Sequence, residues 1–270
     1  MRGTSLASLA AAETAVGPVV AAAGADAATL GAELFALVDA LDGSGSLRRT
    51  LADPALPGAA KERLVRSLLA QADPRTVDVA AALVQRRWSA DADLAEAVER
   101  VATQALLTAA EVRGELAEVE DELFRFGRAL LGQREVLGIL SDPSVPAASR
   151  AELVERLLGG KASDVTLQLA RRAAAAPRGR RYPAALGRLS DLVAERRQRS
   201  AAAVTVAVPL TAAQRDRLGG LLERALGHAV QINEIVDPAV LGGLRVQVGP
   251  QVMDATTLGR LADARRRMAG

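Results

Sequence analysis

The chain has 270 residues, of which 50% are hydrophobic and 2% aromatic, and its formal net charge is +2. It has no cysteine and a single histidine, which excludes disulfides and thiolate metal sites and leaves almost nothing for a histidine-based metal site or proton relay. Because alanine and leucine dominate the composition, we expect a mainly helical protein of one large domain or two to three small ones.

The N-terminal stretch from Thr14 to Ala25 is apolar and rich in alanine, but Gly17 and Pro18 interrupt it. It faintly resembles a signal peptide, against which Glu13 and its weak hydrophobicity argue. No window approaches the ~18 uncharged apolar residues that a membrane span needs. We therefore interpret this stretch as an amphipathic first helix and expect no direct membrane span.

The chain contains an internal repeat with an offset of 89 residues. LADPALPGAAKERLVRSLL from Leu51 matches LSDPSVPAASRAELVERLL from Leu140 without a gap, and the match extends upstream to ELF at Glu33 and Glu122. Of the 37 positions aligned, 15 are identical, including an Asp-Pro pair and a second proline. The sequence therefore predicts a duplicated helical unit of roughly 90 to 100 residues.

Each copy predicts the same series of helices. The first helix carries Glu-Leu-Phe, and a short second helix must end at the Asp-Pro pair, because the residue before proline leaves the α region. A second proline, Pro57 or Pro146, then opens an amphipathic helix. The remaining helices are expected at about Thr76–Arg87 and Leu94–Ala110 in the first copy, and at about Ser163–Ala174 and Tyr182–Arg199 in the second.

The junction between the copies allows two interpretations. The segment from Asp93 to Gly132 has no proline, and its only early glycine is Gly114. Either the last helix of the first copy runs into the first helix of the second, or the two helices meet at a hinge at Gly114.

From Ala201 the pattern changes to that of a small α+β module. AAAVTVAVPL predicts a strand, and AVQINEIVDP and GLRVQVG predict two more. Between the first two strands an amphipathic helix is expected, capped by Thr211. Its inward residues are expected to be Leu218, Leu221, Leu222 and Leu226. A closing helix should begin near Thr256 or Thr257.

Three features that suggest chemistry are better explained structurally. GGKAS, at Gly159–Ser163, lacks the first glycine and the Ser/Thr of a phosphate loop, since Glu155 and Ala162 stand there. His228 has no readable catalytic partners. The acidic cluster is expected to be a solvated helix face: Glu118, Glu120, Asp121 and Glu122. We predict no catalytic, cofactor or metal site.

VDPAVLGGLRVQVGPQVMDATTLGRLADARRRM, at Val236–Met268, resembles the C-terminal region of the delta subunit of bacterial rotary ATP synthase, the oligomycin-sensitivity-conferring protein of mitochondria. The resemblance extends back to about Val101, and the additional N-terminal copy resembles the long delta subunits of actinobacteria. Ala255 replaces the glycine of the usual Asp-Gly-Ser, and Pro250 stands where Asp is common. The structural motif of the family is matched at Asp237, Pro238, Gly242, Gly243, Gly249 and Asp254.

The resemblance implies a non-catalytic stator subunit without a cofactor, peripheral to the cytoplasmic face of the cell membrane through the complex. It implies an extra helical bundle at 1–100, a bundle at 101–200 that holds N-terminal segments of the head's alpha subunits, and a module at 201–270 that grips b or b-delta-type stalk helices. The extra bundle is expected to hold a second alpha segment or to brace the stalk. The partner interface is expected in a groove between the first and fifth helices of the second bundle, at Leu106, Leu107, Ala110 and Leu167.

Two other classes of protein were weighed against this interpretation. A basic nucleic-acid-binding protein is suggested by the pI of about 9.6 and by arginine runs such as 178–181 and 265–267. Interleaved acidic residues and the lack of an aromatic platform weigh against it, so we expect no nucleic-acid partner. A generic helical adaptor is the other alternative.

Overall fold

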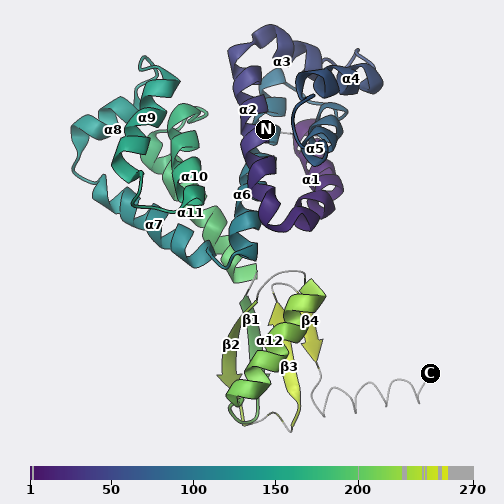
Figure 1. The fold of residues 1–270 in the computed structure, drawn as a ribbon, viewed down its shortest axis with the longest axis vertical. Helices are drawn as coiled ribbons and strands as arrows, with labels where there is room; N and C mark the ends of the chain where they lie inside the picture. Colours follow the sequence, from purple (N-terminus) through teal and green to yellow (C-terminus); the bar gives the residue numbers. More distant parts are fainter. Residues whose placement is uncertain are drawn as a thin grey trace. The chain divides into compact units, whose positions relative to one another are not determined.

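Figure 1 shows the helices and strands of the computed structural model. The structure describes residues 1, 3–199, 201–226, 230–238, 240, 242–248 and 251–254. The chain divides into two units, of which unit 1 ends at Val112 and unit 2 begins at Arg113. The described residues are mainly helical and end in a small mixed sheet, which confirms the predicted fold class.

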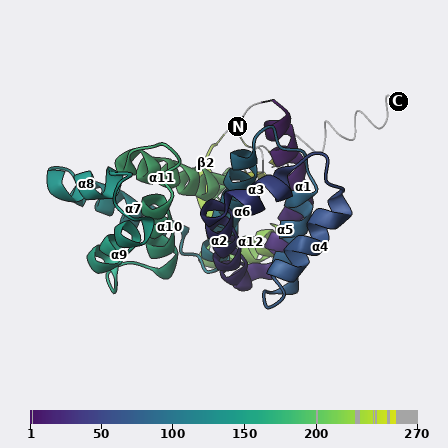
Figure 2. The same ribbon diagram turned by 90° about the horizontal axis from the view of Figure 1, so that it is seen from above.

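Unit 1 is helical apart from short connections. In Figures 1 and 2, α1 lies beside α5 and α2 lies beside α6. Along α1 the buried residues recur every three or four positions, so one face packs inward. The opposite face consists mainly of alanine and other apolar residues, so the helix is not amphipathic as expected, and it starts earlier than expected. The helices of unit 1 are α1 (Thr4–Ala23), the 3₁₀ turn η1 (Gly24–Asp26), α2 (Ala27–Gly43), α3 (Gly45–Ala52), α4 (Gly58–Leu68), α5 (Pro74–Val84) and α6 (Asp91–Val112).

A close contact between α2 and α6 forms the centre of unit 1. A Cβ atom built on Gly31 of α2 would lie 3.0 Å from both the carbonyl oxygen of Ala102 and the side chain of Leu106 on α6. Only a residue without a side chain lets the two helices approach this closely. Leu30 and Leu34 on α2 are completely buried beside this contact.

One apolar stretch differs from the sequence expectation. The described residues contain one helical stretch, Thr4–Gly43, that is long and apolar enough to cross a membrane by length and composition. The expectation that no stretch of the chain approaches the length and apolarity of a membrane span was therefore wrong. A buried core helix passes the same test, and Leu9, Val16 and Val20 of α1 are buried within unit 1.

The Asp-Pro pairs end helices in both copies, as predicted. Helix α3 ends at Ala52, and the Asp53 carboxylate accepts a hydrogen bond from the backbone N–H of Ala55 at 2.8 Å. In the second copy the Asp142 carboxylate accepts from the backbone N–H of Ser144, also at 2.8 Å. Each aspartate therefore closes a short side-chain turn before the following helix begins.

Unit 2 begins with a second set of helices in the same order. Its core contains Tyr182, whose ring stands edge-on to Phe126 with centroids 6.3 Å apart and whose hydroxyl donates to the carbonyl oxygen of Ala170 at 3.1 Å. Burial raises the pKa of this hydroxyl above its ordinary value. The helices are α7 (Leu116–Ala129), α8 (Arg134–Ser141), α9 (Ala147–Leu158), α10 (Asp164–Ala175) and α11 (Tyr182–Arg199).

Gly114 separates α6 from α7. Its φ of 73° lies in the left-handed region, which glycine adopts without strain and which ends an α-helix. Of the two interpretations of this junction, the interrupted helix is therefore the correct one. The expected boundary between residues 100 and 101 falls inside α6, and the three-part division at 100 and 200 stays a prediction.

The C-terminal module contains a four-stranded sheet in the order β2-β1-β3-β4. Strands β1 and β2 are parallel, whereas β3 is antiparallel to both β1 and β4. The parallel pair needs a crossover, which α12 (Ala212–Leu226) supplies across one face of the sheet in Figure 1. The strands are β1 (Ala201–Val206), β2 (Gln231–Val236), β3 (Leu244–Val248) and β4 (Gln251–Asp254).

The predictions for this module are mostly confirmed. Thr211 caps α12, since its hydroxyl accepts from the backbone N–H of Gln214 at 3.3 Å. Leu222 is buried against the sheet and Leu218 packs beside it, but Leu221 is 50% exposed and does not face inward as predicted. The side chain of Leu226, His228 and the expected closing helix lie outside the described residues.

Candidate interaction surfaces

The structure corrects the position predicted for most of the partner interface. Leu106, Leu107 and Ala110 lie on α6, which belongs to unit 1, and their side chains are at most 3% exposed. They are therefore core residues of the first copy and do not line a groove in the second. The resemblance to the family indicated a groove beside these residues, but the sequence does not show which neighbouring helix covers them. Leu167 lies half-buried on α10. Its role in binding stays a prediction.

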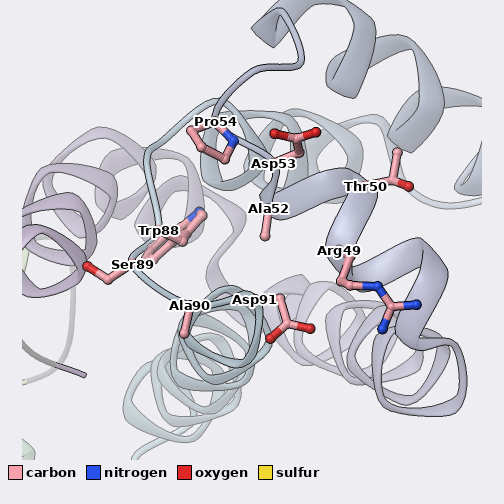
Figure 3. Close-up of a pocket in the computed structure, with 9 residues that line it drawn as sticks. All are labelled: Arg49, Thr50, Ala52, Asp53, Pro54, Trp88, Ser89, Ala90 and Asp91. Atoms are coloured by element: carbon pink, nitrogen blue, oxygen red, sulfur yellow. The ribbon is translucent and has the colours of Figure 1, made fainter.

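A shallow pocket of about 360 Å³ opens in unit 1 between the end of α3 and the loop before α6 (Figure 3). Trp88 forms one wall, and its indole N–H donates to the carbonyl oxygen of Leu83 at 3.0 Å. The Arg48 guanidinium lies 2.9 Å from the Asp91 carboxylate and lowers the pKa of that carboxyl. The pocket is lined by Arg49, Thr50, Ala52, Asp53, Pro54, Trp88, Ser89, Ala90 and Asp91.

The side chains of this pocket make structural contacts and do not suggest a catalytic role. The hydrogen bond to Leu83 holds the Trp88 ring, and the ion pair holds the Asp91 carboxylate. Both groups are therefore committed to contacts within unit 1. Among the described residues, no cluster of three or more histidine, cysteine, aspartate or glutamate side chains has the geometry to hold a metal ion.

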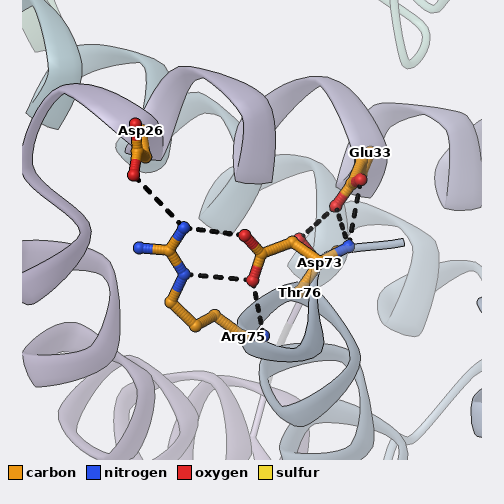
Figure 4. A network of polar contacts seen from close by, with 5 residues as sticks. All are labelled: Asp26, Glu33, Asp73, Arg75 and Thr76. Atoms are coloured by element: carbon orange, nitrogen blue, oxygen red, sulfur yellow. Dashed lines mark hydrogen bonds and ion pairs between the residues drawn. The ribbon is translucent and has the colours of Figure 1, made fainter. Parts of the chain in front are cut away.

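A polar network at the N-terminus of α5 joins distant parts of unit 1 (Figure 4). The Glu33 carboxylate on α2 accepts from the backbone N–H of Asp73 at 3.1 Å and from the Thr76 hydroxyl at 2.5 Å. Asp73 caps the helix by accepting from the N–H of Arg75 at 2.8 Å. The Arg75 guanidinium lowers the pKa of the Asp73 carboxyl, chiefly by hydrogen bonding, and also reaches Asp26. Free donors at a helix start thus receive acceptors from another helix.

The second copy repeats this arrangement at the start of α10. The Glu122 carboxylate accepts from the backbone N–H and hydroxyl of Ser163 at 2.9 and 2.7 Å, and from the Thr166 hydroxyl at 2.6 Å. The glutamate of each ELF motif is therefore a clamp. It joins the helix that carries it, α2 or α7, to the start of a helix about 40 residues later, α5 or α10. Sequence reasoning missed this role, although both glutamates occupy equivalent positions of the repeat.

The acidic cluster on α7 is spread around the helix. Glu122 forms the clamp, Glu120 pairs with Arg197 at 2.8 Å, and Asp121 pairs with Arg125 at 2.8 Å. These carboxylates therefore do not converge on one point, as expected. Glu120 and Glu122 are half-buried and contact other helices, however, so the prediction of a solvated face holds only for Glu118 and Asp121.

The GGKAS segment ends α9 and does not form a phosphate loop. Gly160 has a φ of 69°, as at helix C-termini, and the Lys161 ammonium donates to the carbonyl oxygen of Leu157 at 3.2 Å. Both features satisfy the end of the preceding helix, so the structural interpretation is confirmed.

The C-terminal motif forms the connection between β2 and β3. The backbone N–H of Asp237 donates to the carbonyl oxygen of Val206 at 2.9 Å, which extends the pairing of β1 and β2. Pro238 follows in the turn, and Gly242 and Gly243 both have a φ of 81°, which confirms the need for glycine there. Asp254 is the last residue of β4, and Gly249 lies outside the described residues.

Two similar helical copies joined to a small mixed sheet define the chain as a modular, mainly helical protein. Residues 98–268 match the family described as ATP synthase delta (OSCP) subunit. The ATP synthase subunit delta of Beutenbergia cavernae is 54% identical over 271 residues, covering 100% of both chains. That of Kineococcus radiotolerans is 46% identical over 269 residues, covering 99% of this chain and 98% of the relative.

A chain from the cryo-electron microscopy structure of the Toxoplasma gondii mitochondrial ATP synthase hexamer is 16% identical, with a TM-score of 0.30 over 62% of this chain and 95% of that one. The sequence matches carry the assignment. The chain belongs to the ATP synthase delta (OSCP) subunit family. It is a non-catalytic stator component of the F-type ATP synthase, a membrane-bound complex.

Proposed function

We propose that this chain links the catalytic head of the synthase to its peripheral stalk during proton-driven ATP synthesis. The helical copies contact N-terminal segments of the alpha subunits, and the C-terminal module contacts b or b-delta-type stalk helices. The chain is then peripheral to the cytoplasmic face of the membrane. The observation that carries this proposal is a similarity to delta subunits that spans both helical copies and the sheet module.

The architecture supports a mechanical role. A stator part must resist torque, which favours several separate contacts, because each further contact becomes effectively intramolecular once the first has formed. Two helical copies and a sheet module supply separate surfaces of this kind. The clamps at Glu33 and Glu122 add cross-links within each copy, which stiffen it against shear.

The proposed contact with alpha segments uses exposed surface. Because Leu106 and Leu107 are buried in unit 1, we assign this contact to the outer surface of α7–α11, including the half-buried Leu167. The first copy is proposed to hold a second alpha segment or to brace the stalk.

Calorimetric titration tests the proposal with the full chain and two sets of peptides, from the alpha N-terminus and from the stalk helices. Both are expected to bind, and neither should displace the other. Binding of neither peptide would refute the linking role. Retention on a nucleic-acid column at ~150 mM salt, with a steep salt dependence, would instead favour the nucleic-acid alternative.

A further inference from the structure

The two copies hold their last helix in different ways. In the first copy α6 meets α2 at Gly31, where an added Cβ would lie 3.0 Å from Ala102 and from Leu106, and both of these residues are fully buried. The corresponding helices of the second copy are α7 and α11, which lie side by side in Figures 1 and 2. Glu120, at the repeat position of Gly31, pairs there with Arg197 of α11. An ion pair therefore replaces the close apolar contact of the first copy.

The start of α11 is firmly anchored in the second copy. Tyr182 is fully buried, its ring stands edge-on to Phe126 of α7 with centroids 6.3 Å apart, and its hydroxyl donates to the carbonyl oxygen of Ala170 of α10 at 3.1 Å. Leu186 and Val193, further along α11, are also buried. Apolar packing and a buried hydrogen bond therefore hold the helix from Tyr182 to Val193.

The end of α11 is held much more weakly. Beyond Val193, no described side chain of this helix is buried. The Nε atom of Arg197 lies 2.8 Å from Oε2 of Glu120 without the alignment of a hydrogen bond, and the two side chains are 44% and 28% exposed. An ion pair that is exposed to this degree contributes little to stability and is screened by salt.

The weakly held end of α11 is also the end that leads to the C-terminal module. Helix α11 ends at Arg199 and β1 begins at Ala201, so a pull on the sheet acts first on the last turn of this helix. The last turns of α6 have no comparable weak point, because Leu106, Ala109 and Ala110 are all fully buried there.

We propose that α11 is a strap that opens from its C-terminal end: the contact between Glu120 and Arg197 releases reversibly while Tyr182 stays in place. Segments with few buried apolar contacts open locally at low free-energy cost, without unfolding the rest of the structure. The strap lets the end of α11 yield under load while the core of the second copy stays intact. The opening is a property of the chain alone, so this inference goes beyond the proposed function and does not depend on it.

Hydrogen exchange of the full chain, followed by mass spectrometry, measures this opening. After correction for intrinsic rates, the amides of residues 194–199 should exchange at least about tenfold faster than those of residues 107–112 at the end of α6, since burial of one large apolar side chain alone accounts for such a factor. In about 1 M salt, exchange at 194–199 should rise roughly 1.5- to 5-fold, and exchange at 107–112 should not. Equal protection of the two helix ends, or an opening that does not respond to salt, would overturn the proposal.

Glu120→Gln tests the ion pair while keeping the shape of the side chain. It should speed exchange at 194–199 by roughly 1.5- to 5-fold and abolish the response to salt. Asp121→Asn is the matched control, because Asp121 is the adjacent residue and pairs with Arg125 within α7, so exchange at 194–199 should not change. Circular dichroism melts verify that both variants are folded. Unchanged exchange in Glu120→Gln, or an equal effect of Asp121→Asn, would refute the strap, whereas failure of the unaltered chain to bind its partner peptides would refute only the proposed function.

Discussion

Gly31→Ala tests whether the close contact between α2 and α6 organises unit 1. The added Cβ would lie 3.0 Å from the carbonyl oxygen of Ala102 and 3.0 Å from Leu106. The side chain of Leu106 has some freedom to move, but the backbone oxygen moves only with the whole of α6. Overpacking of this kind costs about 1–3 kcal/mol.

A second effect of the substitution has the opposite sign. Alanine is favoured over glycine within a helix by about 1 kcal/mol. The expected net destabilisation of unit 1 is therefore roughly 0–2 kcal/mol, which is too wide a range to interpret alone. Gly43→Ala is the matched control, because Gly43 is the last residue of α2 itself and a Cβ there would meet nothing within 4 Å. It should gain at most the propensity term of about 1 kcal/mol.

The difference between the two variants isolates the contact. The helix-propensity terms of the two variants largely cancel, so Gly31→Ala should be less stable than Gly43→Ala by about 1–3 kcal/mol. Urea denaturation followed by tryptophan fluorescence measures this directly, since the single tryptophan, Trp88, is buried in unit 1. If both variants stabilise unit 1 equally, α6 does not approach α2 as closely as the structure shows, and the reasoning fails.

Three further substitutions test the polar contacts. Glu33→Ala should destabilise unit 1 by about 1–2 kcal/mol in the same assay, because the donors at the start of α5 lose their acceptor; an unchanged midpoint would contradict the clamp. Tyr182→Phe should cost about 1 kcal/mol in a thermal melt, because the Ala170 carbonyl loses its buried donor, and a neutral result would mean that water replaces it. Hydrogen bonding to Arg75 depresses the folded-state pKa of Asp73, so its contribution is present above the unfolded value of about 3.9 and is lost as the pH falls through the folded value. The stability difference between the unaltered chain and Asp73→Asn should therefore shrink in acid, and a constant difference from pH 7 to 3 would argue against the pair.

The sequence by itself determined the local structure and the duplication. Proline fixes φ and disfavours a helical residue before it, so the ends of α3 and α8 followed from Asp53-Pro54 and Asp142-Pro143 without any knowledge of the fold. Alternation of apolar residues likewise located β1, and the threonine hydroxyl at 211 located the start of α12. The family also followed from the sequence, because its motif lies in consecutive residues.

Only the tertiary structure determined which apolar helix face is buried and which neighbouring helix buries it. Leu106 and Phe124 both lie on apolar faces at helical spacing, yet one is completely buried and the other is 60% exposed. Periodicity defines a face, whereas its burial depends on how closely a helix distant in sequence approaches, and for Leu106 the glycine at 31 permits that approach. The clamps at Glu33 and Glu122 escaped prediction for the same reason, since each joins groups about 40 residues apart that only folding brings within hydrogen-bonding distance.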